Sequence, residues 1–123
     1  MPRPSRTRIH SERVLRETGL DRRCVAVRAI DLDVLDLEEE SAAVCDAFLA
    51  EARRTIAEDH AEAIVLGCAG LSPLVEPLTA ALGIPVIEGV SAAVKMVEGL
   101  VRLGLGTSKI SSYGYPPAKG GSR

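Results

Sequence analysis

Residues 63–89 read AIVLGCAGLSPLVEPLTAALGIPVIEG, and their pattern of apolar and turn residues indicates the fold class. Two compact apolar runs, 63–67 and 84–87, enclose a segment with helical character. Apolar runs of this length are typical of strands that are buried on both faces of a parallel sheet. A strand, a helix and a second strand in this order predict a parallel pair joined by a right-handed crossover.

The same alternation extends outward from this stretch. A helix is predicted over 41–59, where apolar side chains recur every four residues at Val44, Phe48, Ala52 and Ile56. Further helices are predicted over 9–18, ended by Gly19, and over 90–103. The β-branched run CVAVRAI over 24–30 predicts another strand. The fold class is therefore α/β, a parallel sheet with flanking helices.

Two prolines mark the connection between the central strands. Ser72 is predicted to cap a helix that has Pro73 in its first turn, where a missing N–H costs little. Pro77 is predicted to interrupt the helical hydrogen bonds, so we expect a kink or a short 3₁₀ turn before 78–82.

The two ends of the chain differ from its middle in composition. Residues 1–8 are basic and lack apolar periodicity, which predicts a flexible tail, and residues 107–123 are rich in Gly, Ser and Pro, which predicts an extended one. One α/β domain is expected over 9–106.

Composition and charge exclude several classes of protein. Hydrophobic residues make up 46% of the 123 residues but aromatic residues only 2%, which disfavours nucleic-acid binding by base stacking. Residues 1–30 are basic and 31–62 strongly acidic, so we interpret the basic start as solvated, with contact to nucleic acid or an anionic surface as the alternative. No apolar run approaches the roughly 18 residues of a membrane span. We expect neither a nucleic-acid nor a membrane partner.

The three cysteines, Cys24, Cys45 and Cys68, include no CxxC pair. An odd number without such a pair predicts neither a disulfide framework nor a metal site, and reduced thiols favour a cytoplasmic location. No GxGxxG or Walker sequence is present, so a nucleotide cofactor is not expected.

Cys68 is the candidate for chemistry because of where it stands. Ligands of parallel α/β sheets bind beyond the carboxyl ends of the strands, and Cys68 directly follows the strand predicted at 63–67. Gly67 and Gly70 leave room for a substrate, and the positive end of a following helix favours the thiolate and an oxyanion. The alternative is a small apolar cysteine buried in a tight turn. Glu88, after the next strand, either caps a helix or faces a ligand.

With these residues in view, the chain resembles a known family. Residues 61–109, which include LGCAG and PVIEGVSAAVK, resemble the C-terminal half of the hydantoin racemases, within the aspartate/glutamate racemase superfamily. GLDRRCVAVRAIDLDVLDLEEE at 19–40 and SYGYPPAK at 112–119 are similar to the same family. The resemblance covers about 9–109.

This resemblance implies one lobe of a two-lobed fold, followed by a C-terminal return segment. It implies a cofactor-independent mechanism in which two cysteines exchange a proton with the substrate from opposite faces. The second of those cysteines corresponds to Cys68, and Gly67, Ala69 and Gly70 would contact the substrate. Glu88, also assigned to substrate binding, stands where the family usually has Asp.

The first catalytic cysteine of the family belongs to the other lobe, and neither Cys24 nor Cys45 matches its motif. We therefore expect a racemase, an isomerase that acts on a 5-substituted hydantoin or on allantoin, of which this chain is a fragment that contributes one base. We expect it to assemble with a complementing N-terminal half or as a homo-oligomer, and the helix predicted at 90–103 to lack its usual partner. The alternative is a non-catalytic interaction or oligomerisation module.

Overall fold

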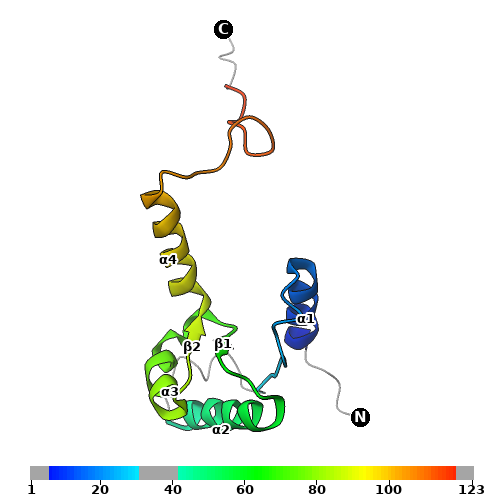
Figure 1. Cartoon of the computed structure of the whole chain (residues 1–123), viewed down its shortest axis with the longest axis vertical. Helices are drawn as coiled ribbons and strands as arrows, with labels where there is room; N and C mark the ends of the chain where they lie inside the picture. The colour runs from blue at the N-terminus through cyan, green and yellow to red at the C-terminus, as the bar shows by residue number, and fades with distance from the viewer. Residues whose placement is uncertain (1–5, 31–41, 119–123) are drawn as a thin grey trace. The chain divides into compact units, whose positions relative to one another are not determined.

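A computed structural model of the chain describes residues 6–30 and 42–118. It forms two compact units, Met1–Val90 and Ser91–Arg123. Figure 1 follows the elements in chain order. They are the helices α1 (Arg6–Thr18) and α2 (Ala42–Asp59), strand β1 (Ile64–Leu66), the 3₁₀ helix η2 (Ala69–Leu74), helix α3 (Val75–Leu82), strand β2 (Val86–Glu88) and helix α4 (Gly89–Arg102).

The two strands of the described residues pair in parallel, as the sequence predicts. Ile64 is paired with Val86, Val65 with Ile87 and Leu66 with Glu88. β2 begins two residues later than predicted and includes Glu88. Pro85 lies just before it, because a proline has no N–H to donate to the neighbouring strand. The Pro85 carbonyl still accepts a hydrogen bond from Ile64 N at 2.9 Å. The register brings the carboxyl ends of β1 and β2 to the same edge of the sheet.

The core of the first unit lies between this sheet and the helices α2 and α3. Helix α3 packs against both β2 and α2 (Figure 1). Four aliphatic side chains form the buried cluster, with Phe48 and Leu49 of α2 packed against it: Leu66, Leu71, Leu78 and Val86. The four-residue stripe predicted for α2 is confirmed, because Val44 and Ala52 are buried and Phe48 and Ile56 are half-buried.

The prediction of a strand over 24–30 is wrong. These residues adopt no strand in the structure. β-branched residues give a segment strand propensity, but a strand needs a neighbour to take its backbone hydrogen bonds, and within the described residues the only pairing is β1 with β2. Hydrogen bonds from the Arg28 side chain connect this segment to α2 instead.

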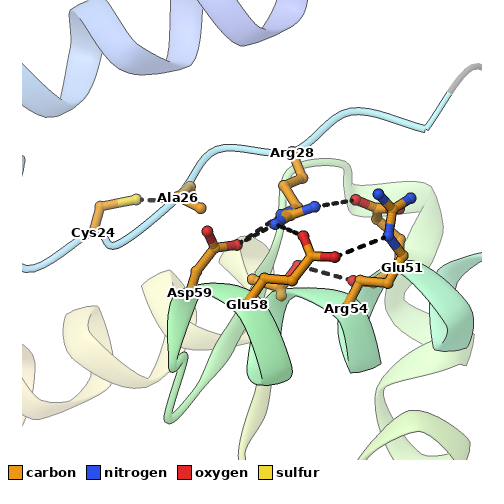
Figure 2. Close-up of polar contacts among 8 residues, drawn as sticks. Cys24, Ala26, Arg28, Glu51, Arg54, Glu58 and Asp59 are labelled. Carbon is orange, nitrogen blue, oxygen red and sulfur yellow. Dashed lines mark hydrogen bonds and ion pairs between the residues drawn. The ribbon is translucent and has the colours of Figure 1, made fainter.

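Arg28 forms ion pairs with three carboxylates of α2, as Figure 2 shows. Its Nη1 lies 3.1 Å from Glu51 Oε1, its Nη2 lies 2.7 Å from Glu58 Oε2, and its Nε donates to Asp59 Oδ2 at 2.7 Å. The hydrogen bonds that Arg28 donates to these carboxylates, that to Glu58 first, raise the pKa of Arg28 above its ordinary value. The hydrogen bond from Arg28 lowers the pKa of Glu58.

Arg28→Ala should lower the urea midpoint of unfolding at pH 7, and this loss should shrink on acidification. Because the folded pKa of Glu58 is depressed, its contribution to stability is present above the unfolded pKa and is lost as pH falls through the folded pKa. Urea titrations from pH 7 to about pH 3 check this, with Arg53→Ala as the control on an exposed arginine of α2. A gap between wild type and Arg28→Ala that stays constant with pH would contradict the assignment.

Helix α1 begins at Arg6, three residues before the predicted start. The flexible tail predicted for 1–8 therefore does not hold at 6–8, and 1–5 lie outside the described residues. Pairs spaced by four residues, Arg8 with Glu12 at 2.9 Å and Arg13 with Glu17 at 3.8 Å, support the helix. Gly19, with φ +73°, ends the helix as predicted.

The prolines act differently from the prediction. Ser72 and Pro73 both lie inside η2, whose N-cap is Cys68, so Ser72 is not a cap. Pro77 is the third residue of α3 and does not interrupt it, because the first amides of a helix have no intrahelical acceptor to lose. The 3₁₀ turn expected before 78–82 does occur, but it ends at Leu74.

Gly83→Ala should destabilise the chain by about 1 kcal/mol, since Gly83 closes α3 with a left-handed φ of +69° that costs an L-residue about 1–2 kcal/mol. A Cβ there would meet no atom within 4 Å, so the cost is conformational. The matched control is Gly99→Ala in the interior of α4, where Cβ space is also open and alanine is the better helix former. Urea unfolding checks both, and equal destabilisation by the two variants would contradict the reason given.

The unit Ser91–Arg123 contains most of α4 and the segment after it. The apolar face predicted for this helix is exposed: within α4, all of which the structure describes, no side chain is buried, and Val97 and Val101 are 57% and 68% exposed. Residues 107–118 form neither helix nor strand. Within the segment that the sequence predicts to be extended, 109–113 bend and turn, Gly114 N donates to the Ser111 carbonyl at 2.7 Å, and Lys109 Nζ lies 5.1 Å from the Tyr115 ring centroid. Residues 119–123 lie outside the described residues.

Candidate active site

Cys68 stands at the carboxyl end of β1, as predicted, and its side chain is exposed. One glycine separates it from the strand, and its extended backbone, with φ −142° and ψ +135°, makes it the N-cap of η2. A Cβ built on Gly70 would lie 3.7 Å from the Cys68 sulfur, so the thiol lies over this glycine. The alternative of a cysteine buried in a tight turn does not hold.

The backbone beside Cys68 offers hydrogen-bond donors. Leu71 N donates to the Cys68 carbonyl at 3.1 Å and closes the first turn of η2. The amides of Ala69 and Gly70 precede this first bonded amide, at the positions where a 3₁₀ helix has no acceptor of its own. Gly67 has open space around its Cβ position. The predicted substrate-contacting backbone therefore lies around an accessible thiol.

Glu88 ends β2 beside this turn, because its register partner Leu66 is two residues before Cys68. The side chain is only 4% exposed, and its Oε2 accepts a hydrogen bond from Val90 N at 2.7 Å. Of the two roles that the sequence allows for Glu88, capping a helix or facing a ligand, this contact is the helix cap. The structure thus places all five predicted site residues, Gly67, Cys68, Ala69, Gly70 and Glu88, at one edge of the sheet.

The other two thiols lie elsewhere. Cys45, on α2, packs against the buried core, and Cys24 Sγ donates to the Ala26 carbonyl at 3.2 Å (Figure 2). Both are half-buried, and all three cysteines are free. Among residues 6–30 and 42–118, no group of His, Cys, Asp and Glu side chains could hold a metal ion. No helix in these ranges is long and apolar enough to cross a membrane.

A cavity of about 680 Å³ lies away from Cys68, between α1, the segment 21–29 and α2. Its charged lining is of mixed sign and largely paired within the protein, as in Arg8 with Glu12 and Arg28 with Glu51 and Asp59. Sequence reasoning did not predict this cavity, because it depends on Arg28 holding segment 24–30 near a helix more than 20 residues further on. The Cys24 thiol in this lining donates to the Ala26 carbonyl, and Glu51 and Asp59 accept from Arg28, so these groups are engaged within the protein. The candidate active site therefore remains at the sheet edge.

The family model described as Asp/Glu/Hydantoin racemase matches residues 2–97, and the chain belongs to this family. It is 51% identical over 108 residues to a hydantoin racemase from Rhizobium meliloti, a match that covers 88% of this chain and 45% of the relative. The chain therefore spans about half the length of the curated relatives it matches.

Two solved structures share the fold at 46% sequence identity. An allantoin racemase from Pseudomonas fluorescens superposes with a TM-score of 0.82 over 94% of this chain and 49% of its own. An allantoin racemase from Klebsiella pneumoniae superposes with a TM-score of 0.84 over 93% of this chain and 46% of its own. The predicted α/β fold class and the family resemblance are both confirmed.

Proposed function

We propose that this chain supplies one of the two proton-transferring groups of a racemase that acts on a 5-substituted hydantoin or on allantoin, and that Cys68 is this group. The observation that carries the proposal is the exposed Cys68 thiol at the carboxyl end of β1, with Gly70 beneath the sulfur and the Ala69 and Gly70 amides next to it. The kinship with hydantoin and allantoin racemases supports the reaction class.

The proposed chemistry is a balanced proton transfer. The Cys68 thiolate removes the hydrogen from C5 of the ring as a proton, and the electron pair of the broken C–H bond passes to the neighbouring carbonyl as an enolate. Backbone N–H donors of Ala69 and Gly70 stabilise the negative oxygen. A proton returned to C5 from the opposite face gives the other enantiomer. Nothing is oxidised or reduced, so we propose that no cofactor takes part.

The group on the opposite face is proposed to come from residues outside this chain. Cys45 packs against the core and Cys24 contacts Ala26, so neither serves as the opposing base at the sheet edge. An N-terminal half in another chain, or a further copy in a homo-oligomer, would supply it. Because the three thiols are free, we also propose a cytoplasmic location.

Racemisation of a single enantiomer tests this proposal. The chain, mixed with the N-terminal half of a longer relative such as the Rhizobium meliloti protein, should abolish the optical rotation of an enantiopure 5-substituted hydantoin or of allantoin. The N-terminal half alone is the control and should leave the rotation unchanged. A mixture that forms a complex and leaves both substrates optically active would contradict the proposed function.

A second candidate, a non-catalytic interaction or oligomerisation module, is favoured by the exposed apolar side chains of α4. Size-exclusion chromatography tests this second candidate. A folded monomer that also fails to bind an N-terminal half would count against an interaction or oligomerisation module.

A further inference from the structure

Glu88 is a buried acid whose role sequence reasoning leaves open. A buried carboxylate is costly unless hydrogen bonds or charge compensate it. Glu88 is 4% exposed, and its Oε2 accepts from Val90 N at 2.7 Å, at the start of α4. The positive end of a helix dipole also favours an acid at this position. The carboxylate is thus compensated at the turn that it caps.

Glu88 is also connected to Cys68 through packed structure. The parallel register sets Glu88 beside Leu66, so the turns that follow the two strands begin next to each other. β2 lies against η2, whose N-cap is Cys68. Leu71 of η2 is buried in the same cluster as Val86 of β2. A shift at the end of β2 therefore reaches η2 through the close-packed Leu71 and Val86 side chains, while residues 67–70, which carry the thiol, are exposed.

We propose that Glu88 is a positioning residue for Cys68. Its carboxylate fixes the β2–α4 turn through the Val90 amide, and this turn in turn holds η2 and the thiol at the sheet edge. The substrate-contacting atoms are then those of residues 67–70, and Glu88 acts on them without touching the substrate. The importance of this role for catalysis rests on the proposed function, but the positioning itself does not.

Four substitutions at position 88 differ in whether the side chain can still accept a hydrogen bond. Asp and Gln keep an acceptor oxygen, and Asp is among the preferred N-cap residues. Ala removes the acceptor and leaves space, whereas Leu removes the acceptor and keeps most of the volume of a buried side chain. The series Glu88→Asp, Glu88→Gln, Glu88→Ala and Glu88→Leu thus separates the hydrogen bond from charge and from packing.

Two measurements on the full chain test the proposal without racemase activity. The first is hydrogen exchange of the Val90 amide by NMR, which should become at least about tenfold faster in the Ala and Leu variants, since a first-turn amide has no helical acceptor. The second is the alkylation rate of Cys68 by iodoacetamide, resolved by peptide mass spectrometry. It should change at least about threefold in the same variants, with Cys24 as the unchanged internal control. Asp and Gln should keep both rates within about twofold of wild type.

Three results would overturn the proposal. If the Val90 amide exchanges at the wild-type rate in the Ala and Leu variants, Glu88 does not cap α4. If Val90 exchange changes but the Cys68 alkylation rate does not, Glu88 caps the helix without positioning Cys68. A Gln variant that behaves like Ala would assign the effect to charge. If circular dichroism shows that the Ala variant does not fold, the comparison of the Leu variant, which lacks the acceptor, with the Gln variant, which keeps it, tests the proposal. Failure of racemisation leaves both rates measurable, so the two proposals fail separately.

Discussion

Leu78→Ala is expected to destabilise the chain by about 3 kcal/mol, the largest stability effect of any single substitution that we propose. Leu78 of α3 is 1% exposed and lies in the buried cluster with Leu66, Leu71 and Val86. Truncation removes its transfer free energy and leaves a cavity that a close-packed surrounding fills only in part. For a domain with a typical stability of about 5–15 kcal/mol, this loss is a substantial fraction of the total.

The urea midpoint followed by circular dichroism measures this effect. Leu103→Ala is the matched control, because the same side chain is 73% exposed there and its truncation should change stability by no more than about 0.5 kcal/mol. Equal shifts in the two variants would show that the core does not lie where α3 meets the sheet.

Cys68→Ser is expected to lower proton exchange at C5 of the substrate by about 10²- to 10⁴-fold, the contribution typical of a positioned general base. A serine hydroxyl is nearly isosteric with the thiol but a far poorer proton acceptor near neutral pH. The exposed position of Cys68 means that the substitution leaves the core intact, so circular dichroism and the urea midpoint should stay unchanged.

Cys24→Ser is the control for this loss. The serine hydroxyl can replace the Cys24 thiol as donor to the Ala26 carbonyl, so this variant should keep wild-type exchange. Full exchange by a folded Cys68→Ser variant would remove Cys68 from the mechanism.

The parts of the fold that the sequence predicted well are those with local causes. The two parallel strands and α2 follow from apolar spacing, and the end of α1 follows from Gly19 with its left-handed φ. The expected burial of both faces of the strands is wrong, because Val65 is 72% and Ile87 40% exposed. The strand predicted over 24–30 failed because pairing is not local: a strand-like pattern does not specify a neighbour. Arg28 replaces that neighbour through carboxylates 23 to 31 residues away, a contact that no pattern of spacing predicts.

The candidate site shows the same division. The position of Cys68 at the carboxyl end of a strand could be predicted because the apolar run at 63–67 and the glycine-containing turn at 67–70 are adjacent in the sequence. Whether the thiol is exposed, and which of two roles the Glu88 carboxylate takes, depend on how η2 and β2 meet, and only the structure shows this. The apolar face of α4 was likewise predicted from spacing, but periodicity does not reveal whether a partner covers it.

The most direct test of the central claim is proton exchange at C5 in D₂O, followed by ¹H NMR on each enantiomer of a 5-substituted hydantoin. The chain paired with an N-terminal half should wash out the C5 proton of both enantiomers faster than the buffer does. Cys68→Ser in the same pair should lose the exchange on the face that Cys68 serves. No exchange by the wild-type pair, or equal exchange by wild type and Cys68→Ser, would contradict the assignment of Cys68 as the proton-transferring group.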